Sequence, residues 1–246
     1  MSISFDASSA LGSASQNAAS FSWSHSGGAS PEGVAIFTFT FAELDILDGD
    51  NATSVTYGGV SVPAVSGGRA ETINTQSSDE YDCKLWFLGS NVPTGTQTVV
   101  VNRTNNSLKM WGVALTFNSS QDSDVHSAGI VLLEDDGSVL EQSVTDGNSG
   151  TGDSLRIAGI ICDTPAFQTS PGDPPSPNFL YPGANSTYRH GLDFGSDTAM
   201  VVTQTTAGTG SQNVGFLANT GYRAAVHVAI KDIVAASVSR RIFMIS

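Results

Sequence analysis

Hydrophobic and polar residues alternate with a period of two along most of the chain, which is typical of β-strands with one buried face. Phe37, Phe39 and Phe41 share one face, and residues 111–117 and 226–230 repeat the pattern. No segment combines a 3.6-residue period with helix caps. The pattern predicts an all-β fold: an antiparallel two-sheet sandwich of jelly-roll type with about a dozen strands and little helix.

Turn residues between the apolar runs support this prediction. Tyr57-Gly-Gly-Val60 separates two β-rich segments by a glycine pair, which favours a tight hairpin. Asp135-Asp-Gly137 indicates another tight connection. A sandwich of this length is commonly one domain, so we expect a single domain over residues 1–233.

One segment departs from the pattern. Residues 170–183 hold five of the nine prolines, which cannot donate to a sheet ladder. We expect a loop excursion over 170–194, either packed on its own sandwich or forming a binding tip. Tyr181, Tyr188 and Arg189 are its candidate contact residues.

Composition narrows the choice of partners. The net charge is −13, from 23 acidic and 10 basic residues, which disfavours nucleic acid and anionic lipid as partners. The negative charge is expected either to keep the protein soluble or to attract a positively charged partner.

The sequence predicts no targeting segment. The first residues lack a basic segment and an apolar run, so no secretory signal is expected, and no apolar stretch is long enough to span a bilayer. Cys83 and Cys162 are expected to be buried, unpaired thiols.

Motifs for chemistry are weak. Gly152-Asp-Ser-Leu155 matches a lipase-esterase tetrapeptide, but no Asp-x-x-His follows it, and chance explains the match. The four histidines lack zinc-site spacing, and a glycosidase carboxylate pair remains open in principle. Residues 146–153 could hold calcium or form a polar turn. We expect no enzyme, and no catalytic, cofactor-binding or metal-binding residues.

Several strand-and-turn segments, taken together, resemble a group of β-sandwich domains found in phage structural proteins and bacterial surface proteins. The similarity covers about residues 19–162. The segments are Ser22–His25, Thr53–Val60, Leu85–Leu88, Pro93–Val101, Trp111–Phe117 and Gly152-Asp153. The resemblance implies a sandwich fold and no catalytic residues. The proline-rich loop and the ending after Ile233 depart from it.

The resemblance favours a capsid decoration or cement protein on the virion surface, made in the host cytoplasm. Its partners would be other virion proteins, the major capsid protein foremost, and further copies of itself as a homo-oligomer, with a trimer as the expected form. The alternatives are a tail-fibre or surface adhesin that binds host glycans, and a carbohydrate-binding module. Glycan binding would favour exposed aromatic residues, whereas Trp23, Trp86 and Trp111 lie in alternating strands and are expected in the core. Trp86 is the least secure, because it shares a face with Asp82 and Lys84.

Residues 234–246 are either a last strand of the sandwich or an anchoring arm that adds a strand to a neighbour. The segment holds an adjacent arginine pair and then four apolar residues, which would aggregate if left exposed. We also expect the His227 face or the 170–194 excursion to contribute to the oligomer interface. The interface candidates at the C-terminus are Arg240, Arg241, Ile242, Phe243, Met244 and Ile245.

Overall fold

The computed structural model describes residues 3–12, 17–42, 51–73, 79–104, 109–118, 121–133, 139–145, 154–163, 166–170, 179–193, 195, 197–218 and 222–232. Within these ranges every regular element is a strand, and the pairing is antiparallel apart from one short parallel pair. The predicted all-β class is confirmed.

The first half of the described chain holds nine strands, which we call the first unit. They are β1 (Ser4–Ala10), β2 (Ser20–Ser26), β3 (Gly33–Ala42), β4 (Ala52–Tyr57), β5 (Val60–Val62), β6 (Ala64–Ile73), β7 (Glu80–Leu88), β8 (Thr96–Arg103) and β9 (Lys109–Asn118).

The second half holds another nine, the second unit. They are β10 (Gln121–Leu133), β11 (Val139–Thr145), β12 (Ser154–Cys162), β13 (Ala166–Phe167), β14 (Phe179–Pro182), β15 (Ser186–Asp193), β16 (Thr198–Gln204), β17 (Ser211–Ala218) and β18 (Arg223–Asp232).

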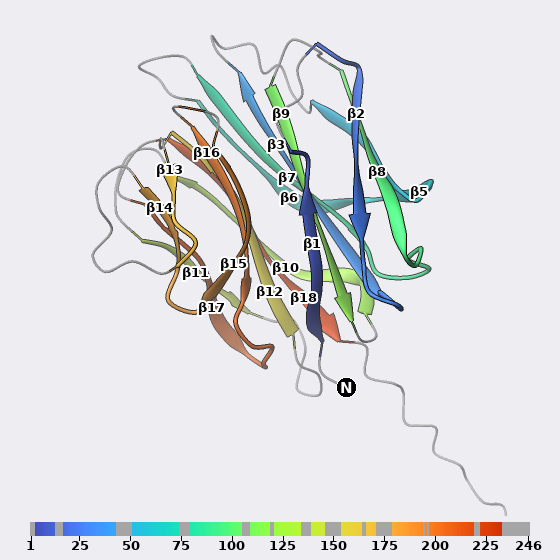
Figure 1. Cartoon of the computed structure of the whole chain (residues 1–246). Coiled ribbons are helices and arrows are strands. Elements are labelled where there is room, and N and C mark those ends of the chain that lie inside the picture. Colours follow the sequence, from blue (N-terminus) through green and yellow to red (C-terminus); the bar gives the residue numbers. More distant parts are fainter. Residues whose placement is uncertain are drawn as a thin grey trace, which may run out of the picture.

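These strands form four sheets in a stack, with sheets B and D outermost (Figure 1). The strand orders are β1-β9-β3-β7-β6 in sheet A, β2-β8-β4-β5 in sheet B, β10-β18-β12-β16-β15 in sheet C and β11-β17-β14-β13 in sheet D. Sheets A and B belong to the first unit, and sheets C and D to the second. The predicted two-sheet sandwich therefore occurs twice, with more strands than expected.

The two units repeat one connectivity. Adding nine to each strand number in sheet A gives the order of sheet C, and the same operation on β2 and β8 gives β11 and β17. The registers agree as well, since Phe37 pairs with Leu85 and Val113, while Ile157 pairs with Thr203 and Val228. Only the edge of sheet D differs, where β13 and β14 pair in parallel. The chain thus contains an internal repeat.

A short sequence match accompanies the repeated structure. Residues 94–99 read Thr-Gly-Thr-Gln-Thr-Val, and residues 209–214 read Thr-Gly-Ser-Gln-Asn-Val. Both glycines have left-handed φ, 75° at Gly95 and 74° at Gly210. In both turns the glutamine amide donates to the threonine carbonyl, over 2.5 Å from Gln97 and 3.1 Å from Gln212. The two turns are therefore equivalent.

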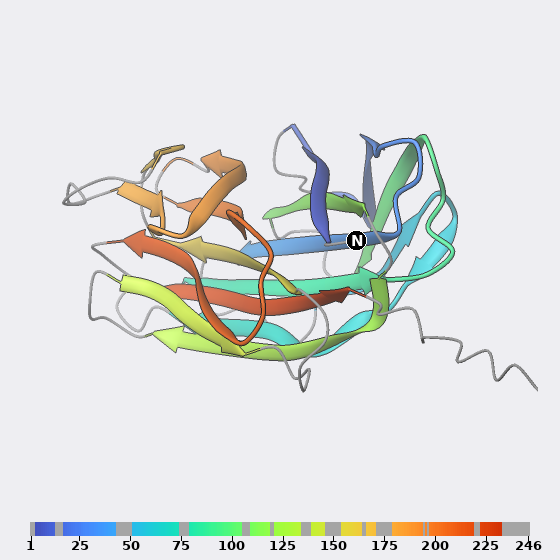
Figure 2. The same cartoon turned by 90° about the horizontal axis from the view of Figure 1, so that it is seen from below.

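Three apolar cores separate the four sheets. The largest lies between sheets A and C and combines the phenylalanines of β3 and the odd-numbered residues of β9 with Ile157, Val226 and Val228. A second core fills the space between sheets A and B, and a third fills that between C and D. Figure 2 shows the central strands of both units, β7 and β18 among them, close together in the middle of the molecule.

The arrangement of the central sheets is pseudo-twofold. Edge strand β1 of sheet A lies near β15 of sheet C, and edge strand β10 of sheet C lies near β6 of sheet A. These two contacts exchange when the units are exchanged, as in an isologous dimer. The two units share the central core, and nothing shows whether either would fold alone. The single domain expected over residues 1–233 therefore stays a prediction. The jelly-roll connectivity also stays a prediction.

Smaller predictions have clear outcomes. The hairpin at 57–60 is confirmed, with Gly58 and Gly59 at φ of 56° and 80°. Cys83 and Cys162 are buried and form no disulfide, as expected. The excursion predicted at 170–194 is wrong for its described part, because residues 179–182 and 186–193 are strands β14 and β15, which pair in sheets D and C. Residues 135–137 and 171–178 lie outside the described residues.

Candidate functional site

The outer face of sheet B carries small uncharged polar side chains around a half-buried Val100, and we call it the hydroxyl face. It arises because β2 alternates strictly between exposed serines and the buried Phe21, Trp23 and His25. Hydrogen bonds link neighbouring strands across it, from Ser26 to Thr96 over 2.8 Å and from Asn102 to Ser54 over 2.9 Å. Its members are Ser22, Ser24, Ser26, Ser54, Thr56, Thr96, Thr98 and Asn102.

The edges of the sheets differ in regularity. The edge strands of the two central sheets, β1, β6, β10 and β15, all contain register shifts. Such bulges discourage a further strand from adding to the edge. Strands β2 and β11, at the edges of sheets B and D, pair through uninterrupted registers. The regular edges therefore belong to the outer sheets.

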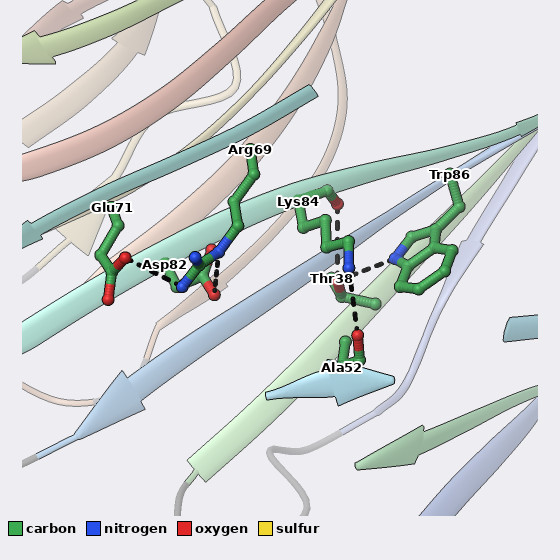
Figure 3. Close-up of polar contacts among 7 residues, drawn as sticks. All are labelled: Thr38, Ala52, Arg69, Glu71, Asp82, Lys84 and Trp86. Atoms are coloured by element: carbon green, nitrogen blue, oxygen red, sulfur yellow. Dashed lines mark hydrogen bonds and ion pairs between the residues drawn. The ribbon is translucent and has the colours of Figure 1, made fainter. Parts of the chain in front are cut away.

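A polar cluster lies on the face of sheet A that is turned toward sheet B (Figure 3). Lys84 donates to the Ala52 carbonyl over 3.2 Å, and its ammonium sits 4.2 Å from the centre of the Trp86 ring. The Trp86 indole donates to Thr38 over 3.2 Å. These contacts hold Trp86 inside the molecule, so it cannot serve as a sugar-stacking platform.

Arg69 completes this cluster at the strand edge. Its guanidinium pairs with Asp82 over 3.1 Å and with Glu71 over 2.9 Å. The Asp82 side chain is buried, whereas Arg69 and Glu71 are partly exposed. The pair with Asp82 therefore ties β6 to β7, and the pair with Glu71 lies within β6.

A second polar network joins β1 to β2 and was missed by sequence reasoning. Thr116 donates to Asp6 over 2.9 Å, and the fully buried His25 lies 3.2 Å from the Thr116 hydroxyl. Ser9 lies 2.7 Å from the other ring nitrogen of His25 and accepts from Trp23 over 3.2 Å. If His25 is neutral, these hydrogen bonds can all run in one direction, from Trp23 through Ser9, His25 and Thr116 to Asp6.

The electrostatics of His25 agree with a structural role. Burial lowers its pKa to about 4, and the nearby Asp6 carboxylate offsets part of that effect. A base with so low a pKa is a poor proton acceptor for a serine nucleophile. The Ser9–His25 pair therefore anchors strand β1. Only long-range pairing brings these residues together, which is why no sequence motif signals them.

The predicted contact residues fall into three groups: buried, half-buried, and outside the described residues. His227 is fully buried between sheets C and D, against the Phe216 ring at 6.1 Å, so the expected interfacial position is wrong. Tyr181 is also buried, at 8% exposure. Tyr188 and Arg189 are half-buried in β15, and their interface role stays a prediction. Arg240, Arg241, Ile242, Phe243, Met244 and Ile245 lie outside the described residues.

The Arg189 guanidinium lies 3.7 Å from the centre of the Phe5 ring and donates to Thr203 over 2.8 Å. It therefore bridges β1 and β15, the edge strands of the two units. On the opposite side of the central core the Tyr81 hydroxyl donates to Asp197 over 2.8 Å. Burial and the Asp197 carboxylate raise the pKa of Tyr81, which keeps this hydroxyl protonated as a donor. Both contacts join the units.

Other expectations from the sequence can be placed. All three tryptophans are buried, as predicted. Ser154 of the lipase-like tetrapeptide is fully buried at the start of β12, which agrees with a chance match. Among the described residues no group of three or more His, Cys, Asp or Glu side chains could hold a metal ion. The candidate calcium loop at 146–153 lies outside them. No helix of the described part is long and apolar enough to cross a membrane.

Comparison with known proteins finds no family model, no curated protein and no solved structure that matches this chain.

Proposed function

We propose that the protein is a non-enzymatic structural protein of a virion surface, a capsid decoration or cement protein. It is made in the host cytoplasm and attaches to other virion proteins, the major capsid protein foremost. The observation that supports this proposal is the hydroxyl face, a regular and uncharged surface on the outside of a closely packed body.

The physical argument concerns solubility before attachment. A protein that folds alone and joins a shell later needs a contact surface that does not aggregate in the meantime. Non-obligate interfaces are about as polar as the rest of a protein surface. Among the residues whose side-chain exposure the structure describes, Val60 is the only large apolar one with substantial exposure, at 37%. The described surface therefore suits reversible, wet contacts.

Self-association belongs to the same proposal. The expected homo-oligomer, a trimer at capsid symmetry positions, would use the regular edge of β2 or β11, since these edges can accept a further strand. The arm at residues 238–246 is the segment proposed to add there. The half-buried Tyr188 and Arg189 flank the junction of the units and offer a second contact.

Reconstitution on particles that lack the protein tests the proposal. Purified protein is added back, and bound protein is measured by co-sedimentation and seen by electron microscopy. Ser24→Lys places a charge on the hydroxyl face and is expected to abolish binding. Ser143→Lys is the matched control, because Ser143 is exposed at the equivalent position of β11 in the second unit.

Two results would count against it. If wild-type protein does not join particles, the decoration role is wrong. If Ser24→Lys binds as well as wild type, the hydroxyl face is not the contact surface.

A further inference from the structure

A polar pocket of about 390 Å³ opens at one end of the second unit. It lies where β16 and β17 are joined, next to the start of β15. Its wall includes Asn185, Gln204, Thr205, Thr206, Gln212 and Asn213. Every side chain of its lining ends in an amide or a hydroxyl, and none carries a charge.

Arg156 forms a fixed support beside this pocket. Its guanidinium is fully buried and donates to Gln204 Oε1 over 3.4 Å. The remaining described bonds go to backbone carbonyls, those of Val144, Ser154, Gly208 and Gly210. The arginine therefore holds the rim of the pocket in place, and its charge is directed into the fold.

The internal repeat shows that this arrangement is specific to the second unit. Ile36 pairs with Ala114 in the first unit, and Arg156 pairs with Ala229 at the equivalent position. Ile36 belongs to the apolar core between sheets A and B. The second unit has thus exchanged a core isoleucine for an arginine that organises polar loops.

Several hydrogen-bonding groups of the pocket remain available to a ligand. Gln204 is 5% exposed, and with Oε1 engaged by Arg156 its Nε2 donates to no group in the described part of the chain. Gln212 uses its amide nitrogen on Thr209, which leaves its carbonyl oxygen as an acceptor. Asn213 is exposed and offers both a donor and acceptors.

We propose that this pocket binds one ring of an uncharged saccharide. Sugar hydroxyls both donate and accept, which matches a wall of amides and hydroxyls. An anion would require a cation that faces the pocket, and an apolar ligand would require apolar walls. The volume falls within the range of small-molecule pockets. The proposal is independent of attachment to a virion.

Titration of the full chain, followed by amide chemical shifts, tests the proposal. The probes are the methyl glycosides of glucose, galactose and mannose, and N-acetylglucosamine, each raised to tens of millimolar. At least one probe is expected to shift the amides of residues 204–206 and 211–213 in a saturable way. Gln212→Ala and Asn213→Ala should each weaken that binding about fivefold, the effect of one lost hydrogen bond.

Gln97→Ala is the matched control. It removes the same turn-closing hydrogen bond in the first unit and should leave saccharide binding unchanged. The proposal is overturned if no glycoside shifts these amides, or if Gln97→Ala weakens binding as much as Gln212→Ala. It is also overturned if inorganic phosphate, and no glycoside, produces the shifts, since the pocket would then recognise anions.

Discussion

His25 shows how one buried side chain can link stability to pH. Its ring accepts a hydrogen bond from the Ser9 hydroxyl and donates one to the Thr116 hydroxyl, and Thr116 in turn donates to Asp6. A proton added to the ring removes the acceptor that Ser9 uses. It also places a charge where water is excluded, which is why the pKa is lowered to about 4.

We predict that the protein loses stability as the pH falls from 6.5 to about 4. In that window the unfolded chain carries a proton on His25 that the folded chain does not, so the contribution is complete above pH 6.5 and declines below it. The loss at pH 4 is about 3 kcal/mol at most. Urea unfolding at several pH values measures it.

His25→Gln should flatten this pH dependence. The pKa of His190 is also lowered by burial, so His190→Gln serves as the comparison and should remove only a part of the slope. An unchanged slope in His25→Gln would contradict the prediction.

At this scale the sequence predicted burial well where apolar residues alternate. Trp111 and the phenylalanines of residues 37–41 lie in the central core, as expected. Thr38 and Thr40 alternate with these phenylalanines and are buried as well, because sheet A is covered on both sides. His227 was misjudged for the same reason, since sheet D covers sheet C.

At the scale of strands and turns, the single residue Arg156 holds the 208–210 turn of the second unit in place. Arg156 holds carbonyls of the 208–210 turn and of β11 together, whereas Ile36 at the equivalent position of the first unit belongs to the apolar core between sheets A and B.

Arg156→Met should therefore destabilise the protein by about 3 kcal/mol, because several buried carbonyls lose their donor. Lys109→Met is the control, since it removes a partly exposed cation and should cost about 1 kcal/mol or less. Chemical denaturation of both variants provides the measurement. Equal effects would contradict the role assigned to Arg156.

The proposed C-terminal arm follows the last described strand of the chain. Strand β18 ends at Asp232, close to the end expected from the sequence. Deletion of residues 238–246 is expected to leave the melting temperature unchanged and to abolish joining of particles or oligomers. Calorimetry and co-sedimentation check this pair of outcomes. Unfolding or aggregation of the truncated chain would show that the segment belongs to the core.

The individual strands were predictable, but their assembly into four sheets was not. Alternation reports which residues are buried and does not report which sheet covers them. The internal repeat left little trace in the sequence beyond the two turns at 94–99 and 209–214, because different apolar residues fill equivalent core positions. The pocket around Gln204 depends on the same assembly.

At the scale of the whole molecule, the shared central core predicts one cooperative unfolding transition. Gly159 lies against the Phe37 ring across the A–C core, so a methyl group there would overlap the ring. Gly112 approaches Trp23 across the A–B core, where a Cβ would lie 2.5 Å from the indole.

Gly159→Ala and Gly112→Ala should each cost about 1–3 kcal/mol by overpacking and should lower the same single transition in calorimetry. Gly12→Ala, with open space around its Cβ, is the control and should change little. Two separated transitions, with Gly112→Ala moving only one of them, would show that the units unfold independently.

The stacking of the sheets also sets a length. Stacked sheets lie about 10 Å apart, so the mean planes of the two outer sheets, B and D, are about 30 Å apart. The two faces look in opposite directions (Figure 1), so partners of the two faces would approach from opposite sides. Because the two units share the central core, the molecule holds two different surfaces at this spacing.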